Sequence, residues 1–256
     1  FWQYTKPAHA QARQLWMQAA QRDPEFAPAF SYLALSYFSS FMNGLDATPD
    51  SFRIACEYAE QALAIDDKES MPRFVLGRVY TLSGRISSAV EELNLAVRLN
   101  PSFAQAHYGL GAALHTLERW EESVEACATA ERLSPRDPMV SAFQSTRALA
   151  LAMGGQMDDA RRVAREATRN PTATYWSHVA LASILGNMGL SDEAGAALAR
   201  LLELRPDFSE ALFDRIFRRS KHETWPDGRP HLARAQIFDG LYKAGLPRSV
   251  PDGDLP

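Results

Sequence analysis

Five prolines recur along this chain at intervals close to one length or a multiple of it, and this recurrence restricts the fold more than any other feature. They are Pro24, Pro101, Pro135, Pro171 and Pro206. An interval of 34 residues separates Pro101 from Pro135, Gly77 from Gly111, Ala89 from Ser123, Ala96 from Ala130 and Ala160 from Ala194. Two helical patterns in each such period predict stacked helical hairpins. Because one hairpin cannot bury its apolar face alone, neighbouring hairpins must close a continuous core between them.

Each period also orders its side chains by size. In the unit 104–135, Gly111 and Ser123 stand where its two helices, A and B, would cross most closely, and a small side chain permits that approach. Pro135 follows helix B because proline cannot continue a helix. Over roughly residues 5–206 these positions resemble the tetratricopeptide repeat family. The resemblance implies an all-α, right-handed superhelical solenoid of about twelve or thirteen helices.

The units predict a division of the chain into two parts. We expect a solenoid of about five repeats over 1–206 and C-terminal capping helices with a tail over 207–256. We expect the first repeat to be truncated, with its helix A either missing or reduced to Phe1–Tyr4. The second carries a nine-residue insertion, since Ala34 and Ala55 are 21 residues apart where regular units have 12. We expect both of its helices to be lengthened and their joining turn, around 41–50, to protrude, with Gly44 as a helix stop and Thr48-Pro49 as a helix start.

The unit 138–171 is longer than the others, because Ser123 and Ala160 are 37 residues apart. We expect its helix A to be about one turn longer. This register places Arg147 where an apolar residue is expected. We favour a solvated Arg147, and the alternative is a half-buried one paired with a carboxylate such as Glu131, since an unpaired buried guanidinium is costly.

Composition excludes several classes of function. The net charge of −4 and the pI near 5.9 argue against a nucleic-acid partner, whose binding surface is normally basic. There is no run of 18 apolar residues, so no membrane span is predicted. Cys56 and Cys127 lack metal-ligand spacing and are expected to be free thiols. No nucleophile is paired with a base, and neither a metal nor a cofactor site is indicated, so we predict a cytoplasmic protein without catalytic residues.

Helix A lines the concave face of a solenoid of this type, and the positions that face inward predict a binding groove. We assign to it Phe38, Phe74, Arg78, Thr81, Tyr108, His115 and Trp176. Aromatic rings with an arginine suit an extended peptide or a short helix, because the guanidinium fixes a carboxylate or a carbonyl. The alternative is that these residues pack between adjacent A helices or against the chain's own C-terminal helix.

A narrower resemblance rests on four segments: 4–13, the lengthened second unit, Ser134–Pro138 followed by Arg147–Ala150, and Leu241–Pro247. They look like the C-terminal repeat tail of bacterial class III adenylate cyclases, a type of tail that winged-helix transcriptional regulators also carry. The resemblance implies a regulatory or partner-binding tail. Its partner is a protein or peptide, including the domain upstream in the same polypeptide, and any cyclase catalytic residues lie before Phe1.

The sequence gives less support to three other classes of function. An enzyme needs a reactive constellation that the chain does not show. RNA-reading helical repeats have a basic concave face, whereas Arg78 is the one arginine at the inward positions here. Self-association is the third class, in which the truncated first repeat exposes apolar surface that a second copy covers as a homodimer.

Overall fold

The computed structural model describes residues 5–45, 50–216 and 232–248. Within these ranges the chain is all helical with no strand, which confirms the predicted fold class. The described helices, in chain order, are α1 (Lys6–Arg22), α2 (Ala27–Asn43), α3 (Ser51–Ile65), α4 (Ser70–Leu82), α5 (Ile86–Leu99), α6 (Ala104–Thr116), α7 (Trp120–Leu133), α8 (Val140–Met153), α9 (Met157–Arg169), α10 (Tyr175–Asn187), α11 (Ser191–Leu204), α12 (Glu210–Ile216) and α13 (Leu232–Lys243).

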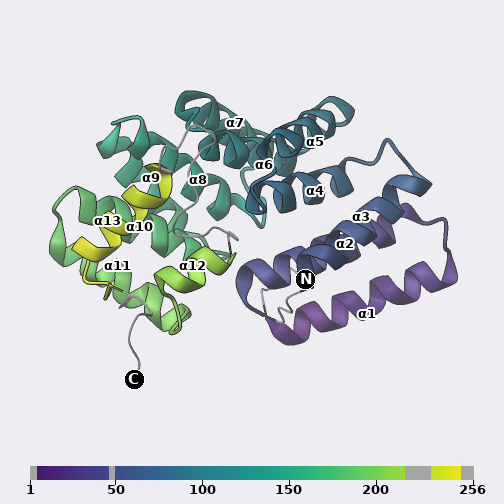
Figure 1. Ribbon diagram of the computed structural model, residues 1–256, viewed down its shortest axis with the longest axis horizontal. Coiled ribbons are helices and arrows are strands. Elements are labelled where there is room, and N and C mark those ends of the chain that lie inside the picture. Colours follow the sequence, from purple (N-terminus) through teal and green to yellow (C-terminus); the bar gives the residue numbers. More distant parts are fainter. Residues whose placement is uncertain (1–4, 46–49, 217–231, 249–256) are drawn as a thin grey trace, which may run out of the picture.

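The helices alternate between two roles along the solenoid. The even-numbered helices α2 to α10 are the A helices, and each packs on the odd-numbered B helix that follows it (Figure 1). Successive A helices also contact each other, so that the hairpins stack in chain order. The buried apolar residues form two clusters, to both of which α8 contributes, and alanine is common along the helix crossings, as at Ala55, Ala89 and Ala160.

Two of the predicted small positions lie at helix crossings. A Cβ atom on Gly77 would come within 2.4 Å of Leu93 Cγ, and one on Gly111 within 2.5 Å of Cys127 Sγ. Both glycines are buried, because α4 and α6 approach α5 and α7 too closely for a side chain. Cys127 is a free thiol at this crossing, and its burial raises the pKa of the thiol to about 12.

Of the nine inserted residues of the second unit, four lengthen α2. This helix has 17 residues where α4 and α6 have 13, and it ends at Gly44, the predicted stop, whose φ of +62° favours glycine. The other helix, α3, has 15 residues against 14 in α5, so it is hardly lengthened. The described part of this helix begins at Ser51, and the predicted Thr48-Pro49 start lies outside the described residues.

The prediction that helix A of the unit 138–171 is one turn longer is wrong. This helix, α8, has 14 residues, one more than α6, and the remaining extra residues lie in the turn 134–139. Asp137 organises that turn: its carboxylate accepts a hydrogen bond from Met139 N at 2.8 Å and another from Gln105 Nε2 at 2.7 Å. Because this carboxylate accepts one hydrogen bond from the backbone of the turn and one from a side chain of α6, the irregular turn is stable without a longer α8.

The ends of the chain depart from the repeat. At the N-terminus α1 packs on α2 like a B helix, and the predicted fragment Phe1–Tyr4 lies outside the described residues. At the C-terminus α12 is short and α13 folds back onto α10. The parts of the predicted tail in 217–231 and 249–256 are likewise outside the described residues, and the boundary near 206 stays a prediction. No described helix is both long and apolar enough to cross a membrane.

Candidate partner-binding site

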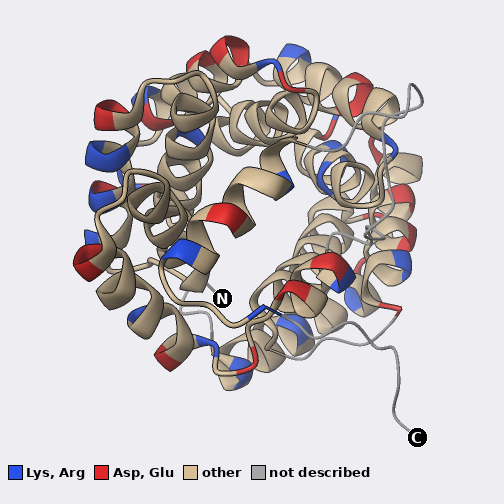
Figure 2. Cartoon of the chain, turned by 60° about the vertical axis from the view of Figure 1, so that its left-hand side comes forward, with Lys and Arg blue, Asp and Glu red and all other residues tan. Residues whose placement is uncertain are grey.

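The concave side of the solenoid holds a cavity of about 190 Å³. Figure 2 shows the helices of the solenoid around a central space. Helix α13 lies within that space, packed on α10. One wall of the cavity consists of the five A helices α2, α4, α6, α8 and α10. The opposite wall comes from Phe213 of α12 and from Ala233, Arg234 and Ile237 of α13. The predicted groove is therefore a cavity with the chain's own C-terminal helices on one side.

Six of the seven predicted groove residues line this cavity. They are Phe38, Arg78, Thr81, Tyr108, His115 and Trp176. Phe74 does not line it: its ring is fully buried beside Phe103, with ring centroids 5.8 Å apart. The expectation that Phe74 faces the groove is therefore wrong. The reason is the glycine at position 109, whose missing side chain leaves room for the Phe74 ring.

Arg78 is one of the two arginines that line the cavity. Its side chain is only 6% exposed, and Nη2 donates a hydrogen bond to Tyr108 Oη at 3.2 Å. The guanidinium carbon lies 4.8 Å from the centroid of the Tyr108 ring and 5.8 Å from that of Phe38, so the charge faces two aromatic rings. Arg78 Nε is buried without a hydrogen-bond acceptor. Among the described residues no carboxylate pairs with this guanidinium, which leaves a charge that normally costs several kcal/mol to bury.

A half-buried arginine, Arg147, is instead paired with a carboxylate. Arg147 Nη1 lies 3.1 Å from Glu131 Oε1, and the two side chains are 18% and 16% exposed. The solvated position that the sequence favoured for Arg147 is therefore wrong, and the paired alternative is correct. Burial raises the pKa of the Glu131 carboxyl and the nearby guanidinium opposes that rise.

On the opposite wall, Arg234 has its charge fully matched. Its guanidinium donates to Asp214 at 2.7 and 2.8 Å and to Glu210 at 2.6 Å, and these hydrogen bonds raise its pKa. Tyr242 Oη donates to the other oxygen of Glu210 at 2.6 Å, and burial together with that bond raises the pKa of Tyr242 to about 12. This network ties α12 to α13, so the two helices form one wall of the cavity.

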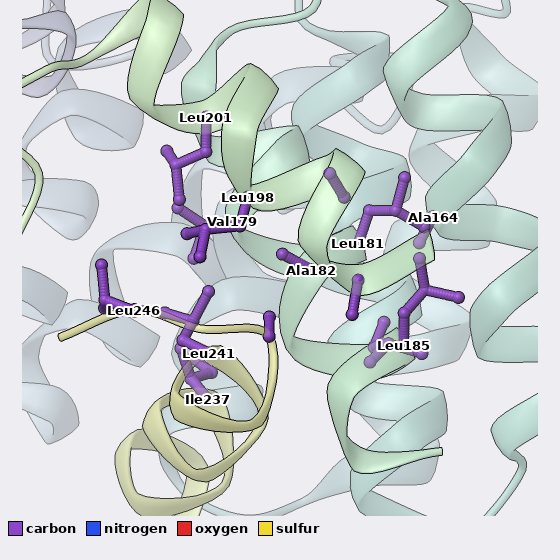
Figure 3. Packing of buried hydrophobic residues seen from close by; sticks show 14 of the residues in the cluster. Ala164, Val179, Leu181, Ala182, Leu185, Leu198, Leu201, Ile237, Leu241 and Leu246 are labelled. Carbon is purple, nitrogen blue, oxygen red and sulfur yellow. The ribbon is translucent and has the colours of Figure 1, made fainter. Parts of the chain in front are cut away.

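Two glycines allow α13 to reach the concave face. A Cβ atom on Gly240 would lie 2.0 Å from the carbonyl oxygen of Ser183, and one on Gly186 would lie 2.0 Å from the carbonyl oxygen of Gly240. The backbones of α10 and α13 therefore touch directly. Around this contact Ile237 and Leu241 face α10 in a shared apolar cluster (Figure 3). The sequence predicts the chain's own C-terminal helix as an alternative neighbour of the groove residues, but it does not identify this backbone contact, whose visible signal is a glycine inside each helix.

The lengthened α2 reaches across to the far end of the solenoid. The carbonyl oxygen of Met42, in the last turn of α2, accepts hydrogen bonds from Tyr175 Oη at 2.9 Å and from Trp176 Nε1 at 3.1 Å. This carbonyl is one of those that a helix C-terminus leaves without an intrahelical partner. Beside it, Gly44 leaves space for the guanidinium of Arg205. The insertion thus joins the second repeat to α10 and closes the cavity on that side.

The remaining polar side chains of the cavity include the Asn43 amide, the His115 imidazole and several hydroxyls. Thr81 Oγ1 donates to the Gly77 carbonyl at 2.8 Å, and Ser145 Oγ donates to the Ser141 carbonyl at 2.6 Å. Among the described residues no group of three metal-ligating side chains comes together. The cavity is thus mainly apolar, with one guanidinium that has no carboxylate partner among the described residues.

Comparisons with known proteins agree with this architecture. Residues 77–118 match the TPR repeat family and residues 177–208 match the tetratricopeptide repeat family. No curated protein matches the chain. Among solved structures, a thermophilic TPR protein of Thermus thermophilus (TTC0263) is 25% identical with a TM-score of 0.56, over 65% of this chain and 89% of that one.

Two further solved structures are similar in fold alone. In the APC/C hetero-tetramer Cut9-Hcn1 the similar chain is 18% identical with a TM-score of 0.66, over 83% of this chain but only 40% of that one. Pseudomonas aeruginosa pilF is 17% identical with a TM-score of 0.53, over 78% of this chain and 95% of that one. Two segments of this chain, 77–118 and 177–208, thus match tetratricopeptide repeats, and the described residues as a whole have the helical-solenoid fold of these neighbours.

Proposed function

We propose that this chain is a partner-binding module that takes a segment of another protein, or of a domain upstream in the same polypeptide, into its concave cavity. The single observation that carries the proposal is Arg78, a buried guanidinium that lines an apolar cavity without a carboxylate among the described residues. A bound acidic side chain or C-terminal carboxylate would supply the missing charge. Phe38, Tyr108 and Trp176 would contact the apolar part of the same segment.

The proposed setting is the cytoplasmic tail of a multidomain bacterial signalling protein. It rests on the resemblance of segments such as Ser134–Pro138 and Leu241–Pro247 to the repeat tails of class III adenylate cyclases. A winged-helix transcriptional regulator is the alternative parent, because it carries the same type of tail. In either setting the module would bind and would not catalyse.

Arg78→Met is the variant that tests the cavity, because methionine keeps the length of the side chain and removes its charge. Tyr108→Ala is less suitable, because the buried Tyr108 ring packs on Phe143, with ring centroids 5.1 Å apart, and its loss would leave a cavity in the core. A displayed library of random peptides is selected on the wild-type chain and counter-selected on Arg78→Met. We expect enriched peptides with an acidic group beside apolar residues, and a loss of affinity of at least about tenfold on Arg78→Met.

Arg98→Met is the matched control, because Arg98 is exposed at the end of α5, away from the cavity. Its affinity for the selected peptides should equal that of the wild type. Peptides that bind Arg78→Met as well as the wild-type chain would overturn the proposal, as would a selection for basic peptides.

Self-association is a second candidate function, and one observation favours it. Leu15 of α1 is 57% exposed, on the helix that ends the solenoid and packs on α2. A second copy covering this end would bury it. We then expect a concentration-dependent dimer in sedimentation equilibrium, and a monomer for Leu15→Glu. A wild-type chain that stays monomeric at millimolar concentration would exclude this candidate.

A further inference from the structure

The charge of Arg78 and the apolar surroundings of the cavity together describe a ligand. Arg78 is more than nine-tenths buried, lines the cavity and keeps Nε without an acceptor. Of the residues that line the cavity, none is an aspartate or a glutamate. Arg234, the other guanidinium in the lining, is already bound by Asp214 and Glu210. Two carboxylates already bind Arg234, whereas none binds Arg78 among the described residues, so the negative charge of a ligand would pair with Arg78.

The size and lining of the cavity favour a small molecule with a compact apolar group. Its volume of about 190 Å³ exceeds the roughly 150 Å³ of an engineered apolar protein cavity that binds benzene. Phe38, Trp176 and Phe213 present rings to this space, and Leu149 and Ile237 present aliphatic groups. An apolar body of one ring therefore fits, with an acidic group at the end that meets Arg78.

We infer that the concave cavity binds small amphipathic monocarboxylates, with the carboxylate on the Arg78 guanidinium and the apolar group between the A helices and α13. This ligand site uses the cavity assigned to the partner segment above, but it does not depend on the partner being a protein. A monocarboxylate is a better match than a phosphate ester, since a second negative charge would be buried without a counter-charge. Such a ligand would compete with a partner segment for Arg78.

Phenylpropanoate is a suitable probe because it joins one ring to one carboxylate, and phenylpropanol is its neutral counterpart. Isothermal titration calorimetry on the purified chain measures both. We expect phenylpropanoate to bind the wild-type chain at one site, and to bind Arg78→Met at least about tenfold more weakly. Phenylpropanol should bind both chains equally weakly. Arg98→Met, which leaves the cavity intact, should bind phenylpropanoate like the wild type.

The outcomes separate this inference from the proposed function. The inference is overturned if phenylpropanoate does not bind the wild-type chain, or if Arg78→Met binds it equally well, whatever the peptide selection shows. Circular dichroism of each variant establishes that it is folded. Should Arg78→Met fail to fold, Arg78→Lys replaces it: it keeps the charge but loses the forked geometry, so it should bind phenylpropanoate more weakly than the wild type does but more tightly than it binds phenylpropanol. The inference is also overturned if Arg78→Lys binds phenylpropanoate as tightly as the wild type does and binds phenylpropanol with that same affinity.

Discussion

Gly240→Ala should separate α13 from the concave face and lower the free energy of unfolding by about 3 kcal/mol. The added Cβ would lie 2.0 Å from the backbone carbonyl oxygen of Ser183, which cannot move as a flexible side chain would. The two helices must therefore part, and the contacts of Ile237 and Leu241 with the α10 cluster are lost with them. Hydrogen exchange should show the amides of α13 losing protection while those of α4 to α7 keep theirs.

Gly195→Ala is the matched control for this substitution. Gly195 also lies inside a helix, α11, but the nearest atom to its added Cβ is the carbonyl oxygen of Ala244 at 3.9 Å, an ordinary contact distance. Alanine forms helix better than glycine, so this variant should gain up to about 1 kcal/mol of stability. Equal effects at the two positions would show that α13 does not dock on α10 as the structure has it.

A second large effect is expected at Arg147. Arg147→Met removes the partner of Glu131 and leaves a buried carboxylate, so the free energy of unfolding should fall by about 3 kcal/mol. Arg78→Met removes a buried guanidinium that has no carboxylate partner among the described residues, and leaves no such charge behind. Its unfolding free energy should stay within about 1 kcal/mol of the wild type, because the lost bond to Tyr108 offsets the relief from burying a charge.

Urea denaturation of the two variants measures this difference. Adding Glu131→Gln to Arg147→Met should restore most of the lost stability, since a neutral amide replaces the unpaired carboxylate. If Arg78→Met lowers the free energy of unfolding as much as Arg147→Met does, then Arg78 stabilises the fold and is not an unpaired group available to a ligand.

The repeat architecture can be predicted from the sequence, because the residues that must contact each other are no more than one or two periods apart. The interval between Gly77 and Gly111 predicts two equivalent crossings, and both are found at the expected places. The helix stop at Gly44 follows from the need for a residue with positive φ. The six cavity residues follow from the same register, since inward positions of consecutive A helices must share one face.

The contacts that complete the cavity do not follow from the repeat. Met42 meets Tyr175 across 133 residues, and this distance depends on how far the solenoid curves, which no local pattern encodes. The docking of α13 depends on Gly186 and Gly240 lying opposite each other in the folded chain. Arg147 was misjudged because its partner, Glu131, sits on the preceding helix and the length of the turn between them decides whether they meet.

The most direct test of the account is a crystal structure of the chain with its strongest selected peptide. The account predicts a carboxylate of the peptide about 2.8 Å from the Arg78 guanidinium, inside the cavity between the A helices and α13. A peptide bound on the convex face or against α1, with Arg78 as unpaired as before, would contradict it.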